Sequence, residues 1–123
     1  MGVRGIRGAI TIEQDTKEEI ISATKLLLEE MVRRNHVVPD DIASILITTT
    51  DDVKAAFPAQ GARLIEGWQY VPLMCAREIP VPGSLPSCIR VMMLVNTEKK
   101  ASEIEHVFMR EAVKLRPDLV KKD

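Results

Sequence analysis

The sequence predicts a single α/β domain in which a mixed β-sheet carries helices on one face. Three observations favour this class: β-branched segments of strand length, a long amphipathic segment of helical period, and the alternation of the two kinds along the chain. A chain of 123 residues fits one domain, 1–123, with one hydrophobic core. The expected order is strand, helix, strand, short helix, strand, strand, helix.

The first half of the chain supplies a strand, a long helix and a second strand. Residues 2–13 combine β-branched side chains with glycine, which predicts a strand with a bulge or a close backbone approach. Thr16 and Glu19 form a capping-box pattern, and apolar residues then recur at the helical period as far as Asn35. Residues 43–50 indicate a strand, whose three consecutive threonines either bind something or simply favour the strand.

The second half begins with a short helix that Pro58 opens and Gly67 stops. Two apolar segments, 68–78 and 87–95, flank a proline-rich loop, and we expect them to pair as an antiparallel hairpin. A last helix is expected from Ser102. The resulting four-stranded sheet would leave one face uncovered, and association of several copies of the chain would cover it.

The composition argues against several classes of protein. A net charge of −1 does not fit a protein that binds nucleic-acid backbone. No apolar run approaches the roughly 18 residues of a membrane helix, and the first residues lack the apolar run of a secretion signal. Cys75 and Cys88 are expected to be reduced. These features predict a cytoplasmic protein with no nucleic-acid or membrane partner.

The sequence lacks the familiar catalytic motifs. It has no glycine-rich phosphate loop, metal-ligand spacing or serine elbow, and neither His36 nor His106 is expected to be catalytic. What remains is a set of arginines around one carboxylate: Arg4, Arg7, Arg63, Arg90, Arg116 and Glu78. Such a set suits a small polyanion, and it suits catalysis by electrostatic stabilisation rather than by proton transfer.

Two interpretations are open for the charged residues within apolar segments. Glu78 and Arg90 each need a partner among apolar neighbours, and in the expected hairpin they could share one face near the loop. From this stretch alone, a structural ion pair is the simpler interpretation. Arg4 and Arg7 either keep an edge strand soluble or contact an anion through their planar guanidinium groups.

Four motifs in the chain are found together in one known family. They are Arg4-Gly-Ile-Arg-Gly-Ala9, Gly67-Trp-Gln-Tyr-Val-Pro72, Cys88-Ile-Arg-Val-Met-Met93 and Leu115-Arg-Pro-Asp-Leu119. In order and spacing they resemble the small monofunctional chorismate mutases of the α/β class, typified by those of bacilli. The resemblance implies a homotrimer that forms a pseudo-α/β-barrel, with active sites between subunits. It also implies the Claisen rearrangement of chorismate to prephenate, on the route to phenylalanine and tyrosine.

The resemblance further implies which residues would act on chorismate, with no cofactor and no metal. Arg90 matches the arginine that contacts the ether oxygen and the side-chain carboxylate. Arg7 matches the arginine that binds a substrate carboxylate, and Glu78 matches the acceptor for the ring hydroxyl. Negative charge grows on the ether oxygen as its bond breaks, so a fixed cation would stabilise the transition state. The site would also hold the flexible enolpyruvyl arm in a reactive conformer.

Other residues would line the same site by resemblance. One wall would consist of Met74, Cys75, Ala76, Arg77 and Glu78, with Cys75 beside the ring hydroxyl. A neighbouring subunit would contribute Phe57, Ala59, Arg63 and Leu73. Arg116 would help to close the site, and residues 117–123 are expected to be a flexible tail.

Two departures from the family pattern bear on substrate binding. Phe108 stands where the family commonly has Tyr, so one hydrogen bond worth about 0.5–1.5 kcal/mol would be lost. Gln60 stands where some members carry Lys, which removes a cation near the entrance. We expect weaker binding rather than lost function.

Two other function classes remain open. Trimeric reactive-imine deaminases have a similar fold and also hold a carboxylate with an arginine, but they need a positioned water and loop motifs that this chain lacks. A non-catalytic binder of small carboxylates would bind chorismate or an aromatic amino acid without turnover. Consumption of chorismate or of 2-aminoacrylate would distinguish these classes.

Overall fold

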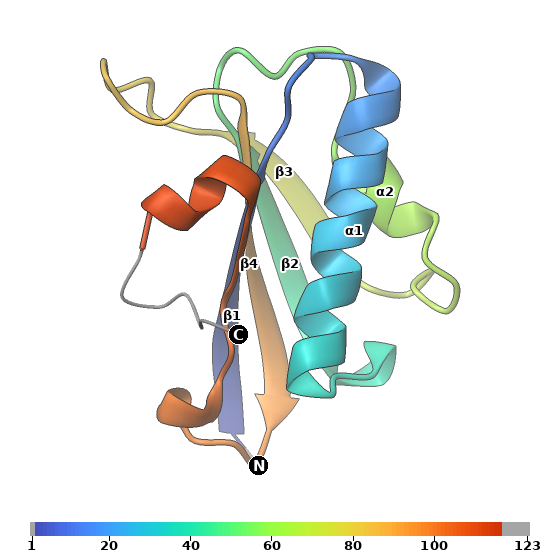
Figure 1. Ribbon diagram of the computed structural model, residues 1–123. Helices are drawn as coiled ribbons and strands as arrows, with labels where there is room; N and C mark the ends of the chain where they lie inside the picture. Colours follow the sequence, from blue (N-terminus) through green and yellow to red (C-terminus); the bar gives the residue numbers. More distant parts are fainter. Residues whose placement is uncertain (1, 117–123) are drawn as a thin grey trace.

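The computed structural model describes residues 2–116, which form one five-stranded sheet with α-helices on one face (Figure 1). The strands are β1 (Gly2–Thr11), β2 (Ile42–Thr49), β3 (Leu73–Arg77), β4 (Cys88–Thr97) and β5 (Val107–Met109). The α-helices are α1 (Lys17–Asn35) and α2 (Ala59–Arg63), and short 3-10 turns form η1 (Pro39–Asp41), η2 (Ala101–Glu103) and η3 (Arg110–Lys114). The expected mixed α/β class is confirmed. The predicted tail, residues 117–123, lies outside the described residues.

The strand order is β3-β2-β4-β1-β5, so β2 lies between the two strands that we expected to pair. β3 runs parallel to β2, whereas β4 runs antiparallel to β2. The predicted hairpin of segments 68–78 and 87–95 is therefore wrong, although both segments contain strands. Alternation of apolar side chains predicts a strand but does not predict which strand it pairs with. The long loop between β3 and β4 allows the chain to pass the end of β2.

The helix expected from Ser102 is also wrong, because this segment forms η2 and then the short strand β5. β5 runs parallel to β1 along Gly8, Ala9 and Ile10. The side-chain amide of Asn35, at the end of α1, pairs with the backbone of Glu105. Its Nδ2 donates to the Glu105 oxygen and its Oδ1 accepts from the Glu105 N–H, both at 2.8 Å. These two bonds hold the chain extended beside β1. Their effect outweighs the helix-like spacing of the apolar residues after Ser102.

α1 begins where the capping pattern predicts. The side chain of Thr16 accepts the N–H of Glu19 at 3.2 Å. The Glu19 carboxylate accepts the backbone N–H groups of Glu13 and Gln14, so it ties the helix to the preceding loop. The helix ends at Asn35, and His36 follows in a left-handed conformation with φ of 54°.

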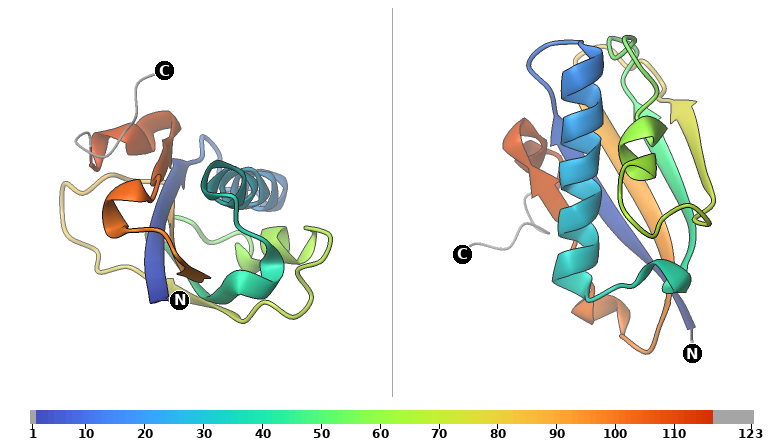
Figure 2. Two further views of the ribbon diagram at one scale, coloured as in Figure 1. Left: turned by 90° about the horizontal axis from the view of Figure 1, so that it is seen from below. Right: turned by 90° about the vertical axis from the view of Figure 1, so that its right-hand side faces the viewer.

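Side chains along β4 alternate between a buried and an exposed side of the sheet. The buried residues pack with α1 and α2: Ile89, Val91, Met93 and Val95. The residues between them are exposed: Arg90, Met92 and Leu94. Figure 2 shows both α-helices on one side of the sheet and η3 on the other. We call these sides the helix-covered face and the open face.

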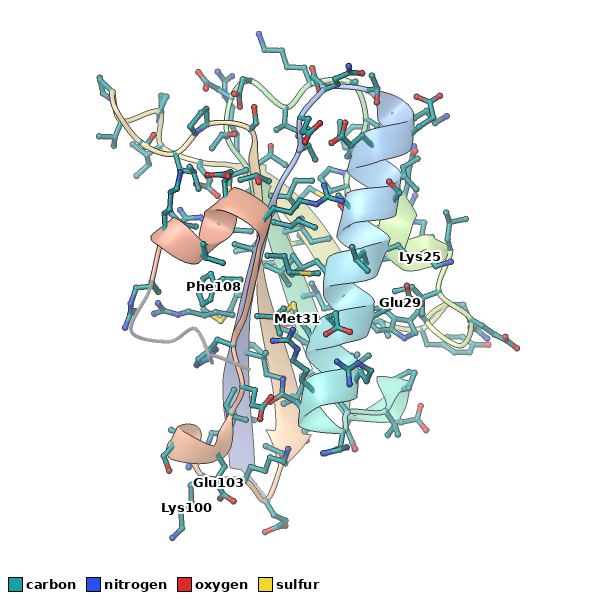
Figure 3. The ribbon with its side chains drawn as sticks, in the orientation of Figure 1. Lys25, Glu29, Met31, Lys100, Glu103 and Phe108 are labelled. Carbon is teal, nitrogen blue, oxygen red and sulfur yellow. The ribbon has the colours of Figure 1, made fainter. Side chains whose placement is uncertain are left out.

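The open face is partly covered by η3. Ala9, Cys88 and Ala112 form a small buried cluster there, with Phe108 packed against it. Phe108 and Met31 of α1 lie on opposite sides of β1 (Figure 3). Further along the open face, Leu46 and Met74 remain 43% and 71% exposed, which agrees with the expectation that one face of the sheet lacks cover.

Gly61 lies where α2 packs against α1. A Cβ at this position would meet the backbone oxygen of Ile21 at 2.7 Å and Cβ of Thr24 at 3.0 Å. We expect Gly61→Ala to lower the free energy of unfolding by about 1–3 kcal/mol, despite the better helix propensity of alanine. Urea denaturation at one protein concentration measures the change.

The matched control is Gly2→Ala, because a Cβ at Gly2 meets nothing within 4 Å. If both variants were as stable as the parent, the close packing of α1 and α2 would be contradicted.

Candidate active site

An ion pair spans three strands on the open face. Nε and Nη2 of Arg90 donate to Oε2 and Oε1 of Glu78 at 2.8 and 2.7 Å. Oγ1 of Thr48 donates to Oε2 of Glu78 at 2.7 Å. Thr48 of β2 is paired with Arg90 of β4 on one side and with Ala76 of β3 on the other. The guanidinium group therefore reaches across β2 to a carboxylate just beyond the end of β3.

The ion pair predicted from the sequence is thus present, although not through a hairpin. Thr48 holds it together, and sequence reasoning did not single out this residue. The run of three threonines was the available signal, but strand propensity explains such a run equally well.

The environment keeps both members of the pair charged. Burial raises the pKa of the Glu78 carboxyl, but hydrogen bonds from Arg90 and Thr48 and the charge of Arg90 outweigh burial and hold the pKa below its ordinary value. The hydrogen bond to Glu78 outweighs burial at Arg90, whose pKa is raised. The Glu78 side chain is only 13% exposed, whereas that of Arg90 is 50% exposed, so the guanidinium group remains accessible to a ligand.

A cavity of about 380 Å³ opens on the open face beside Arg90. Its lining includes three guanidinium groups and an apolar wall: Arg7, Arg90, Arg116, Leu46, Met92, Phe108 and Leu115. The volume lies in the range of small-molecule sites. Guanidinium groups match carboxylates in shape and charge, so the cavity suits a small anion with an apolar body. Arg4 is directed elsewhere, and its Nε donates to the backbone oxygen of Lys99 at 3.1 Å.

A second cavity, of about 620 Å³, lies beside the loop that follows β2. Its lining includes five residues for which the sequence predicted a place at or near the site: Phe57, Gln60, Cys75, Ala76 and Arg77. Lys17 and Lys54 add two further cations. The side chain of Phe57 is 70% exposed.

The other predicted residues line neither cavity. Met74 lies on the open face opposite Leu46, and Arg63 is exposed at the end of α2. Ala59 is buried, and Leu73 packs against the core on the helix-covered face. The predicted site residues are therefore divided between separate surfaces of one chain.

Cys88 is not suited to act as a nucleophile. Burial and the nearby charge of Glu78 raise the pKa of the Cys88 thiol to about 12, so this thiol stays neutral.

Within residues 2–116, no three His, Cys, Asp or Glu side chains are grouped to hold a metal ion. In the same part of the chain, none of the helices has the length and apolar character needed to cross a membrane.

Fold and site together define a small α/β protein with an arginine-lined pocket for a compact anion. Residues 3–119 match the family of type I chorismate mutases, and the chain belongs to that family. It is 50% identical over 119 residues to chorismate mutase AroH of Bacillus subtilis (strain 168), which covers 97% of this chain and 94% of that protein. It is 52% identical over 118 residues to chorismate mutase AroH of Thermus thermophilus, with 95% and 96% covered.

A solved structure agrees with the sequence relatives. A chorismate mutase from Clostridium thermocellum superimposes with a TM-score of 0.86 at 50% identity, covering 89% of this chain and 96% of that chain. The resemblance predicted from the four motifs is confirmed.

The charge of Glu78 makes a pH-dependent contribution to stability. Because its pKa is lowered in the folded protein, the contribution is fully present above the ordinary value of 4.5 and is lost as the pH falls through the folded value. We expect the difference in unfolding free energy between the parent and Glu78→Gln to shrink as the pH falls below about 4.5. Urea denaturation at a series of pH values measures it.

Glu66→Gln serves as the control, because Glu66 is an exposed carboxylate in a loop. A difference for Glu78→Gln that did not vary with pH would contradict the role assigned to this ion pair.

Proposed function

We propose that the open-face cavity is the place where this chain rearranges chorismate to prephenate. As a member of its family the chain is an isomerase of aromatic amino acid biosynthesis. The observation that carries the proposal is that Glu78 and Thr48 hold Arg90 at the wall of a cavity that also presents Arg7 and Arg116. Chorismate carries two carboxylates on a compact carbon skeleton, which matches guanidinium groups around an apolar wall.

In this proposal Arg90 is the principal catalytic group. Two of its N–H donors bind Glu78, and a guanidinium group has five such donors, so others remain on its exposed side. These donors would stabilise the negative charge that grows on the ether oxygen as the C–O bond breaks ahead of C–C bond formation. Because Glu78 already fixes the guanidinium group, little reorganisation is needed when the charge appears.

Glu78 would also bind the ring hydroxyl of the substrate. Its Oε2 accepts hydrogen bonds from both Arg90 and Thr48, whereas Oε1 accepts one from Arg90. Each carboxylate oxygen has two lone pairs, so Oε1 is the atom with room for another donor. Arg7 would hold a carboxylate, and Arg116 would help to close the site.

We expect Arg90→Lys to lower kcat by about 10²–10³-fold, because lysine keeps the charge but loses the fork that binds Glu78 and the substrate together. The assay follows the loss of chorismate absorbance, with prephenate confirmed by acid conversion to phenylpyruvate. Arg33→Lys is the control, since the side chain of Arg33 is 69% exposed on α1. Near-normal turnover by Arg90→Lys would remove the basis of the electrostatic mechanism.

We infer that a neighbouring copy of the chain completes each site. Phe57 and Arg63 are exposed and line no part of the open-face cavity, although we expect them at the site from the resemblance to the family. Leu46 and Met74 leave apolar surface on the open face that association would cover. A homotrimer with interfacial sites accounts for both features. The trimer and the cytoplasmic location stay predictions.

A mixing experiment tests the shared site. Arg90→Ala and Arg63→Ala should each be inactive or weak, but random co-assembly should restore up to about a quarter of the parent's sites, because the two residues come from different copies. The two variants are unfolded, mixed, refolded and assayed with chorismate, with each variant refolded alone as a baseline.

The control mixture combines Arg90→Ala with Arg7→Ala. Arg7 and Arg90 line one cavity of one chain, so no mixed assembly contains an intact pair and no activity should return. Recovery in the control mixture, or none in the test mixture, would contradict a site divided in this way.

The family match favours the mutase over the reactive-imine deaminase and over the non-catalytic binder. Phe108 and Gln60 line the two cavities, and the weaker binding that we expect from them stays a prediction. Binding of chorismate without turnover would point to the binder, and consumption of 2-aminoacrylate alone would point to the deaminase.

A further inference from the structure

His106 lies beside the backbone of Arg7, the arginine that is proposed to bind the substrate carboxylate. The backbone N–H of Arg7 donates to Nδ1 of His106 at 2.9 Å. The parallel pairing of β5 with β1 begins one residue later, where Val107 is paired with Gly8. The imidazole therefore supplies the acceptor for the Arg7 amide at the point where the strand ladder starts.

This hydrogen bond bears on the direction of the Arg7 side chain. The amide of Arg7 points along the sheet toward β5, whereas its side chain projects from the open face into the cavity. Fixing the amide fixes the backbone of Arg7 and with it the direction of the Cα–Cβ bond. A guanidinium group at the end of a long side chain amplifies any error in that direction.

His106 is itself held in place by α1. The preceding peptide, at Glu105, is clamped by the side-chain amide of Asn35 through two hydrogen bonds of 2.8 Å. Asn35 is only 3% exposed, and Nζ of Lys99 donates to its backbone oxygen at 2.9 Å. A continuous series of contacts thus runs from the end of α1 through His106 to the cavity.

We propose that His106 is a positioning residue: its unprotonated Nδ1 holds the backbone of Arg7 so that the Arg7 guanidinium group meets the substrate carboxylate. The inference rests on the proposed function of the open-face cavity. His106 itself does not line the cavity and takes no part in the chemical step.

The protonation state of His106 decides whether the hydrogen bond exists, because an imidazolium Nδ1 carries a proton and cannot accept. Burial lowers the pKa of His106, and the charges of Arg7 on β1 and of Arg116 after η3 lower it further. α1 contributes the neutral Asn35 to the adjacent peptide. The imidazole is therefore neutral at pH 7, and the hydrogen bond is lost only as the pH falls below the ordinary value of 6.5.

Two variants of the full-length chain separate the acceptor from the bulk of the ring. In His106→Asn, the side-chain oxygen takes the place of Nδ1 and accepts at every pH. In His106→Leu, a methyl group takes that place and accepts nothing. We expect KM for chorismate in His106→Leu to rise about 3- to 10-fold at pH 7.5, with kcat changed less. KM should change more than kcat because the carboxylate bound by Arg7 is charged in both the ground state and the transition state.

His106→Asn should keep KM within about twofold of the parent at pH 7.5. In the parent, KM should rise as the pH falls below the lowered pKa of His106, and in His106→Asn this rise should disappear. The chain has only two histidines, and His36→Asn is the matched control. His36 is exposed with φ of 54°, a conformation that asparagine tolerates, so this variant should retain the parent's pH profile.

The inference is overturned if His106→Leu binds chorismate as tightly as the parent, or if His106→Asn loses as much affinity as His106→Leu. If His106→Leu fails to fold, the pH profile of His106→Asn decides, and an unchanged rise of KM at low pH overturns the inference. If the parent does not convert chorismate, the proposed function fails by itself. The Arg7 amide resonance, followed while His106 titrates, then tests the hydrogen bond directly, and an amide signal that ignores the titration overturns the inference.

Discussion

The alternation of side chains along β4 is the constraint on which both the core and the candidate site depend. β4 is paired with β2 on one side and with β1 on the other, so both neighbours constrain its register. Ile89 and Val91 are buried under the helices, and Arg90 between them must face the open side. A slip of one residue would place the Arg90 charge in the core and expose the aliphatic side chains, at a large cost in free energy. The packing that forms the core therefore also orients the cation that we propose to be catalytic.

Arg90 would still be free to change rotamer if nothing held its far end. Thr48 of β2 and Glu78, just beyond the end of β3, hold it, and the three side chains meet on the open face across β2. The carboxylate reduces the net charge beside the cavity but fixes the guanidinium group in one orientation. For a reaction in which the catalyst moves no proton, a fixed dipole and a fixed cation are the useful groups.

The remaining wall of the cavity depends on contacts between the two ends of the chain. β5 places Phe108 opposite Ala9 of β1, beside the strand that carries Arg7. Arg110 then adopts a left-handed conformation with φ of 57°, and its Nη1 donates to the backbone oxygen of Thr11 at 3.0 Å. This turn brings Leu115 back over the open face, where it lines the cavity. Contacts between residues that lie far apart in the sequence thus determine the shape of the site.

Local patterns in the sequence were enough to predict the α/β class, the strands β1, β2 and β4, and the start of α1 at Thr16, because side-chain periodicity and helix capping act over a few residues. The pairing need of Glu78 and Arg90 could also be inferred locally, since a charge among apolar neighbours requires a partner, and the motifs identified the family. The tertiary structure was needed to show that β2 lies between β3 and β4, that Thr48 joins the ion pair, and that the segment after Ser102 contains a strand. It also separated Phe57 from Arg90. Packing and hydrogen bonds between distant segments determine which strands pair, and side-chain periodicity within one strand does not predict this pairing.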